Sequence, residues 1–151
     1  MRRFAIGATA VGLLLALCFP LSGAAAPTSV SAVDLPLTAF GAITVDPLTG
    51  VVYVSSGVDN AVVRVTPDGA VRRLDGLPRA AGLAVAGSTL YVELPGQHAV
   101  AAVDTVTFTE RARLATGADT CPTHLAGGGA TVWFGYGCGR SFGTAGLGRI
   151  D

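Results

Sequence analysis

The hydrophobic pattern of this chain is a series of short apolar runs separated by turn residues. In the clearest example, Val51–Val54 and Ala61–Val65 flank a polar turn over Gly57–Asn60. Valine and tyrosine favour a pleated sheet, whereas glycine, aspartate and asparagine tolerate the backbone angles of tight turns. The stretch therefore predicts a β-hairpin.

The same pattern recurs twice along the chain. Tyr53 and Tyr91 are 38 residues apart, and Tyr91 and Trp133 are 42 residues apart. Four short strands that repeat every ~40 residues are typical of β-propeller blades. We therefore expect an all-β fold of blades with four antiparallel strands each. The units cover about residues 43–74, 83–114 and 125–151, and the last strand of the second unit is expected over Thr107–Leu114.

The repeat predicts an incomplete propeller. Ile150-Asp151 matches Val103-Asp104, so the sequence stops inside its third unit and supplies fewer than three full blades. Propellers have at least about four blades, because a single blade cannot bury both of its faces. We expect a fragment of a longer chain, with closure by other copies as the alternative. A β-sandwich is a further alternative, but the 38-residue spacing of matched residues argues against it.

The N-terminal segment predicts export. Arg2 and Arg3 precede an almost wholly apolar run over Phe4–Leu21, and small residues follow before Pro27. This is the pattern of a secretory signal peptide, with an uncleaved membrane anchor as the alternative. The small residues favour cleavage, and we expect a secreted, extracellular protein with no stable membrane insertion afterwards. We assign residues 1–32 to the signal peptide, 33–39 to a linker and 40–151 to the partial propeller.

The charge of the mature chain argues against a nucleic-acid partner. All ten basic residues are arginine, and loss of Arg2 and Arg3 leaves eight against ten acidic residues, a formal charge of −2. Binding to nucleic acid depends on neutralising phosphates with clustered basic residues. No basic stripe is present in the sequence. The predicted partner is instead an unidentified extracellular ligand or protein.

The cysteines agree with export. Cys18 lies in the signal segment, which leaves Cys121 and Cys138 in the mature chain. An even pair in an exported protein predicts a disulfide. The alternative is a metal site, but two thiolates need further ligands and only His124 is close in sequence. We therefore predict a disulfide, with no metal and no cofactor.

The repeat resembles known propeller families. Tyr53-Val54-Ser55-Ser56 with Asn60–Val65 is similar to the YVTN-type repeat, and Asp46-Pro47 with Thr49–Val54 is similar to the lead-in strand of NHL propellers. The resemblance covers about Phe40 to Asp151. It implies a propeller fold and an exported or surface-exposed protein, in families that include binding and scaffold proteins.

The third unit also resembles the virginiamycin B (streptogramin) lyase family. Val132-Trp133-Phe134 followed by Gly146–Asp151 is similar to the L-W-F-T-E and I-G-R-I signatures of these propeller enzymes. Gly135-Tyr136 stands in place of the family's T-E. The catalytic histidine and acidic positions of the family fall largely in blades that this sequence does not contain. No catalytic residue is therefore carried over.

Two side chains are candidates for a site in the central channel. His124 enters the first strand of the third unit, and Glu93 replaces Ser55 after the Tyr-Val strand. Imidazole titrates near neutrality, but one carboxylate without a partner is a weak signal for acid–base work. His98, at the position equivalent to Asn60, is interpreted as a solvated turn residue. The sequence favours a non-enzymatic binding or scaffold module, with a streptogramin-lyase-like enzyme whose catalytic blades lie beyond Asp151 as the alternative.

Overall fold

The computed structural model describes residues 32–118, 120–128, 130–138 and 145–151. The chain divides into two units, Met1–Ala32 and Val33–Asp151, and the fold described below belongs to the second. The predicted signal peptide lies outside the described residues, except for Ala32. Within the described residues, no helix has the length and apolar character that a membrane span requires.

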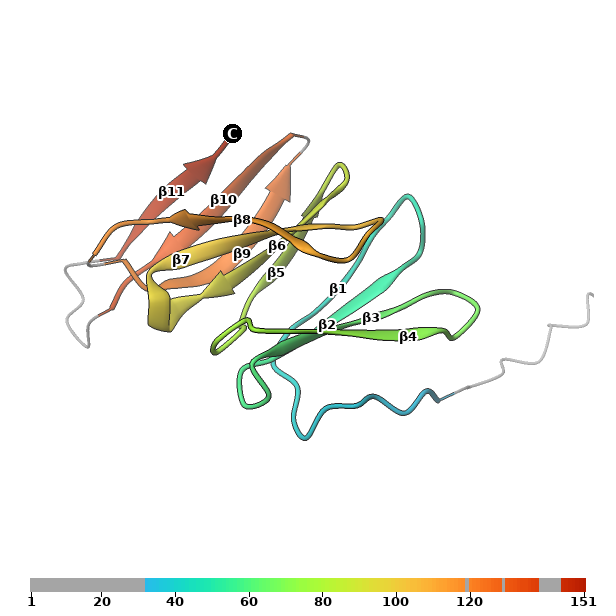
Figure 1. Cartoon of the computed structure of the whole chain (residues 1–151). Coiled ribbons are helices and arrows are strands. Elements are labelled where there is room, and N and C mark those ends of the chain that lie inside the picture. Colours follow the sequence, from blue (N-terminus) through green and yellow to red (C-terminus); the bar gives the residue numbers. More distant parts are fainter. Residues whose placement is uncertain (1–31, 119, 129, 139–144) are drawn as a thin grey trace, which may run out of the picture. The chain divides into compact units, whose positions relative to one another are not determined.

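The second unit folds into three antiparallel sheets, each formed by strands that are neighbours in sequence (Figure 1). The first sheet holds β1 (Ile43–Val45), β2 (Val52–Ser56), β3 (Ala61–Val65) and β4 (Val71–Asp75). The second holds β5 (Leu83–Ala86), β6 (Thr89–Leu94), β7 (Ala99–Asp104) and β8 (Glu110–Ala115), with the 3₁₀ helix η1 (Pro95–Gln97) between β6 and β7. The third places β10 (Thr131–Tyr136) between β9 (Pro122–Gly128) and β11 (Gly146–Ile150).

Strand pairing places the three repeat aromatics at one equivalent position. Tyr53 of β2 pairs with Thr44 of β1, and Tyr91 of β6 pairs with Ala84 of β5. In the third sheet, Trp133 of β10 lies opposite a residue of β9 in the same way. The prediction of an all-β fold built from repeated blade-like units is therefore confirmed.

The first strands of the three sheets are neighbours in space. β5 contacts both β1 and β9. In the sequence, three other strands lie between β1 and β5, and three lie between β5 and β9. The approach of β9 to β5 is close at Gly127, where an added Cβ would lie 2.9 Å from the carbonyl oxygen of Val85. Contact between first strands is the arrangement of adjacent propeller blades, whose inner strands surround a common axis.

The main core fills the space between the first two sheets. Tyr53 and Val62 of the first sheet pack with Leu90 and Val92 of the second and with Phe108 of the β7–β8 turn, and all five side chains are buried. The rings of Tyr53 and Phe108 have centroids 6.1 Å apart. These side chains alternate along their strands, so one face of each sheet supplies the core.

The turn after β7 differs from the expected strand boundary. The final strand of the second sheet begins at Glu110 rather than at Thr107. The carboxylate of Asp104 accepts hydrogen bonds of 2.7 Å from the amides of Val106 and Thr107, which holds a turn at this point. Phe108 then adopts a φ of 56° and its ring enters the core. Local side-chain capping therefore overrides the strand propensity of this segment.

The segment before β1 contacts the first sheet without forming a strand. Asp59, in the β2–β3 turn, accepts hydrogen bonds from the amide and the hydroxyl of Thr38, at 2.9 and 3.0 Å. The hydroxyl of Ser56 also donates to Asp59, and Arg73 donates to the carbonyl of Pro36. These contacts fix the path of the chain as it enters β1.

Candidate functional site

The candidate site lies where the first strands of the three sheets begin. A cavity of about 380 Å³ is lined by residues at the N-terminal ends of β1, β5 and β9: Gly41, Ala42, Ala81, Gly82, Leu83, Thr123, His124 and Leu125. Each sheet contributes the residues at or just before its first strand. The cavity is therefore built by equivalent positions of the three repeats.

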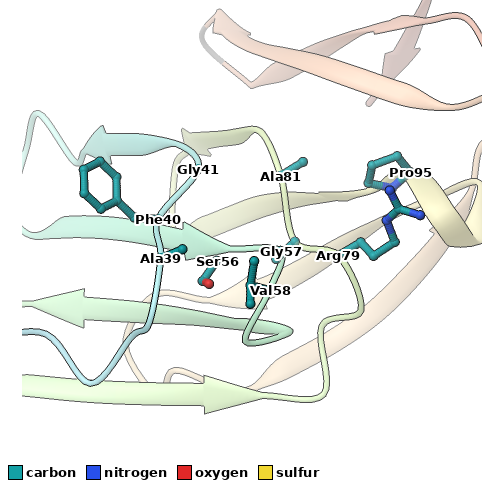
Figure 2. Close-up of a pocket in the computed structure, with 10 residues that line it drawn as sticks. Ala39, Phe40, Gly41, Ser56, Gly57, Val58, Arg79, Ala81 and Pro95 are labelled. Carbon is teal, nitrogen blue, oxygen red and sulfur yellow. The ribbon is translucent and has the colours of Figure 1, made fainter.

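A second cavity of about 440 Å³ adjoins the first and shares Gly41 and Ala81 with it. Its remaining residues come from the segment before β1, the β2–β3 turn, the segment before β5 and the start of η1: Ala39, Phe40, Ser56, Gly57, Val58, Arg79, Ala80 and Pro95. Figure 2 shows the exposed Arg79 side chain extending toward Pro95 at one side of this cavity. Exposed Phe40 and Val58 supply apolar surface. The two cavities together offer apolar walls with a few polar groups, the composition of many ligand sites.

Side chains from the second strands support the cavity wall in two of the sheets. Ser55 of β2 accepts a 3.0 Å hydrogen bond from the amide of Ala42 and donates a 2.6 Å bond to the carbonyl of Ala81. Glu93 of β6, at the equivalent position, accepts a 2.9 Å bond from the amide of Gly82. Each of these side chains therefore holds the start of the first strand in its own sheet, and Ser55 also joins the first sheet to the second.

Glu93 is fully buried, and its carboxyl group lies directly behind Gly82. An added Cβ on Gly82 would lie 2.2 Å from Oε2 of Glu93, so this carboxyl fits only because the neighbour is glycine. The other oxygen, Oε1, has no hydrogen-bond partner among the described residues. Burial raises the pKa of Glu93 to about 7, although the hydrogen bond from Gly82 opposes the shift. The side chain therefore lies beneath the cavity wall.

His124 lies on the cavity wall itself. It is exposed, it belongs to β9, and its Nδ1 is 3.1 Å from the hydroxyl of Thr123. Its neighbour across the strand pair is Gly135, which occupies the position of Ser55 and Glu93 but has no side chain to hold the β9 backbone. The histidine is free of the buried network that surrounds Glu93, and the two residues form no mutual hydrogen bond within the described part of the chain.

The structure contains the predicted disulfide between Cys121 and Cys138. It joins the start of β9 to the end of β10, where the register of the two strands shifts near Gly135 and Tyr136. The amide of Gly137 donates a 3.3 Å hydrogen bond to the carbonyl of Cys121 beside the disulfide. The disulfide therefore fastens the end of this strand pair, where regular pairing stops.

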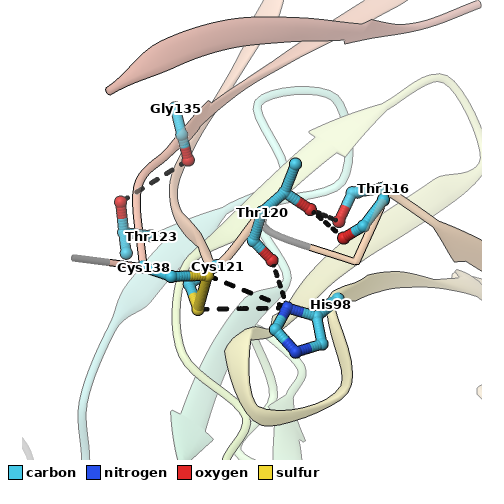
Figure 3. Close-up of a disulfide and its surroundings, with 8 residues drawn as sticks. His98, Thr116, Thr120, Cys121, Thr123, Gly135 and Cys138 are labelled. Carbon is cyan, nitrogen blue, oxygen red and sulfur yellow. Dashed lines mark hydrogen bonds between the residues drawn. A yellow bond between two sulfur atoms is a disulfide. The ribbon is translucent and has the colours of Figure 1, made fainter. Parts of the chain in front are cut away.

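His98 is placed differently from the solvated turn residue that its sequence suggested. It is half-buried, and its ring faces the disulfide, with Nδ1 4.0 Å from Cys121 Sγ and 3.8 Å from Cys138 Sγ (Figure 3). Nδ1 donates a 2.6 Å hydrogen bond to the carbonyl of Thr120, since a carbonyl oxygen only accepts. The interpretation failed because the contact joins residues of two different sheets.

The contact of His98 could have been predicted by comparing it with Asn60, the residue at the equivalent position of the first unit. Both residues have a positive φ, 50° and 54°, at the same turn of successive units. The side chain of Asn60 accepts a 2.9 Å hydrogen bond from the amide of Arg79, in the segment that leads into β5. His98 binds Thr120 in the corresponding segment before β9. Alignment of the repeats therefore indicates that this turn residue reaches toward the next unit.

Comparison with known proteins identifies the fold. No protein-family model and no curated protein matches the chain. Among solved structures, virginiamycin B lyase from Staphylococcus aureus matches with a TM-score of 0.60 and 16% identity, over 79% of this chain and 44% of that one. A streptogramin B lyase structure matches with a TM-score of 0.57 and 18% identity, over 79% of this chain and 43% of that one.

An extracellular domain gives a similar result. The extracellular domain of the one-component system BT4673 from B. thetaiotaomicron matches with a TM-score of 0.54 and 15% identity, over 73% of this chain and 14% of that one. The chain thus spans less than half the length of each of these three structures. Identities at this level carry information on the fold alone. The resemblance to propeller proteins inferred from the sequence is confirmed at that level: the chain has the fold of consecutive β-propeller blades, similar to those of the streptogramin lyases.

Proposed function

We propose that this chain is an exported propeller module that binds an extracellular ligand at the start of β1, β5 and β9. The observation that carries the proposal is the cavity lined by equivalent positions at the start of the three first strands, with a second cavity adjoining it. Support for export comes from the signal-like N-terminus, the disulfide and the likeness to an extracellular domain. Exported proteins keep their disulfides, which cytosolic conditions would reduce.

The lining residues define the chemistry of the expected ligand. Apolar contact is available from Phe40, Val58 and Leu83, while Arg79 and His124 add polar groups at the cavity walls. A ligand that combines an apolar group with a hydrogen-bond acceptor or an anionic group fits this combination. Backbone groups around the cavities are fixed by the sheets and by Ser55 and Glu93 side chains, so little ordering is needed when a ligand binds.

A cavity-filling substitution tests the proposal. Ala81 lines both cavities, so Ala81→Trp is expected to block them, whereas Ala70→Trp places the same ring in the exposed β3–β4 turn. The full chain would be screened by ¹⁹F NMR against small fluorinated aromatic carboxylates. We expect fragments to bind the unmodified chain and the Ala70→Trp variant, and to lose binding in Ala81→Trp. Equal binding to both variants would place the ligand elsewhere and refute the proposal.

A second candidate function is opening of a streptogramin ring. It is favoured by the structural likeness to two streptogramin lyases, one of which has been crystallised as an inactive variant with quinupristin. The test is incubation of the chain with quinupristin, followed by chromatography of the small molecule. An unchanged quinupristin peak is expected if the chain is a binding module. A time-dependent product that needs the folded chain would favour the enzyme instead.

A further inference from the structure

The described part of the chain contains one group of three potential metal ligands, His98, Cys121 and Cys138. Their ligand atoms all lie within 4.8 Å of one another. They come from three separate segments: the β6–β7 turn, the start of β9 and the end of β10. We propose that, when the disulfide is reduced, these residues form a binding site for a thiophilic divalent cation such as Zn²⁺. The site is distinct from the cavities at the start of the first strands.

The distances from the imidazole to the two sulfurs already match a tetrahedral site. With Zn–S bonds of about 2.3 Å and a Zn–N bond of about 2.1 Å, the nitrogen lies about 3.6 Å from each sulfur and the sulfurs lie about 3.8 Å apart. The observed distances from His98 Nδ1 are 3.8 Å to Cys138 Sγ and 4.0 Å to Cys121 Sγ (Figure 3). Two changes are needed: the sulfurs separate when their bond is reduced, and Nδ1 of His98 gives up its 2.6 Å hydrogen bond to the carbonyl of Thr120.

The backbone around the site is held by contacts other than the disulfide. The pairing of β9 with β10 extends to Tyr136 and Pro122, and the amide of Gly137 bonds to the carbonyl of Cys121. The carbonyl of His98 accepts a 2.8 Å hydrogen bond from the amide of Thr116. Reduction therefore leaves both thiols beside the imidazole. Cys138 is exposed, so its side chain can rotate away from Cys121 without displacing core residues.

The chemistry of loading balances with a dithiol as reductant. The dithiol is oxidised to its own disulfide and leaves two cysteine thiols, and the cation then displaces their two protons. The Nδ1 proton, which is now donated to the Thr120 carbonyl, must leave that nitrogen, and the imidazole becomes the Nε2–H tautomer. Two thiolates neutralise the charge of the cation. The fourth position remains open for water, as in sites with three protein ligands.

Cobalt is the probe for this site, because tetrahedral thiolate coordination gives Co²⁺ strong visible absorption and a sulfur charge-transfer band. The full chain would be reduced with a dithiol, separated from the excess dithiol by gel filtration without oxygen, and titrated with Co²⁺. We expect one tetrahedral Co²⁺ per reduced chain and none per oxidised chain. His98→Ala is expected to weaken binding by at least about tenfold, since even the loss of an outer partner of a metal ligand costs that much. Asp34→Ala, which removes another potential cation ligand from an exposed position, is expected to have no effect.

Circular dichroism measures whether the reduced chain keeps its fold. If reduction unfolds it, Zn²⁺ is expected to restore the strand signal of the wild-type chain but not that of His98→Ala, because binding then supplies folding free energy. The proposal is overturned if reduced wild type shows only the spectrum of hydrated Co²⁺. It is also overturned if His98→Ala and wild type bind Co²⁺ equally, which would indicate thiols acting without the imidazole.

Discussion

Glu93 gives the sharpest test of the packing behind the cavity wall, through the substitution Glu93→Gln. The carboxyl of Glu93 is fully buried, accepts one hydrogen bond from the Gly82 amide and leaves Oε1 without a partner. Glutamine has nearly the same shape and keeps an acceptor for the Gly82 amide, but it cannot ionise. The substitution therefore removes the charge with little change in packing.

Burial raises the pKa of Glu93 from its ordinary value of 4.5 to about 7 in the folded chain. Between these two values the folded state holds a proton that the unfolded state has released. The contribution of Glu93 to the free energy of unfolding is therefore greatest below about pH 4.5, falls as the pH rises and levels off above about pH 7. Each unit of pKa difference corresponds to about 1.4 kcal/mol, so the full loss at alkaline pH is about 3 kcal/mol.

Urea denaturation of the full chain at several pH values measures this loss. We expect wild type to lose about 3 kcal/mol of unfolding free energy, relative to Glu93→Gln, between about pH 4.5 and about pH 8. Asp34→Asn is the control, because Asp34 is an exposed carboxylate of the segment before β1. It is expected to keep the wild-type dependence on pH. A Glu93→Gln chain whose stability follows the same pH curve as wild type would show that this carboxyl does not carry the burial penalty.

Four further variants test the same structure by urea denaturation. Gly82→Ala is expected to destabilise the chain by about 1–3 kcal/mol through overpacking against Glu93. Adding Glu93→Ser should recover most of that loss, because the pair then reproduces the first sheet, and no recovery would contradict the equivalence of the two positions. Replacing both Cys121 and Cys138 by serine should cost about 3 kcal/mol for a loop of 17 residues, and an unchanged midpoint would refute this. Phe108→Ala should lower the free energy of unfolding by about 3–5 kcal/mol, because its ring is buried against Tyr53. A smaller loss than that caused by Val106→Ala, a change at an exposed residue, would refute the assigned core position.

Repetition in the sequence was sufficient to predict the blades. The 38-residue spacing from Tyr53 to Tyr91 reappears as an identical register position in β2 and β6. Strand and turn propensities depend on neighbouring residues in the chain, so a local pattern carries them. The disulfide was also predictable, because the sequence has two cysteines outside its signal-like N-terminal segment, and such a pair favours a disulfide. The start of β8 was not predicted correctly, because the side chain of Asp104 caps a turn that includes Thr107.

The sequence alone determined the strands, the repeat and the pair of cysteines, because each depends on residue type and spacing along the chain. Tertiary structure decided the surroundings of individual side chains. In the folded chain, Glu93 is buried behind Gly82, and the imidazole of His98 lies beside the disulfide. The contact of Glu93 with Gly82 forms between two paired strands of one sheet, and the contact of His98 with Thr120 joins successive units. Spacing along the chain therefore carries no record of them.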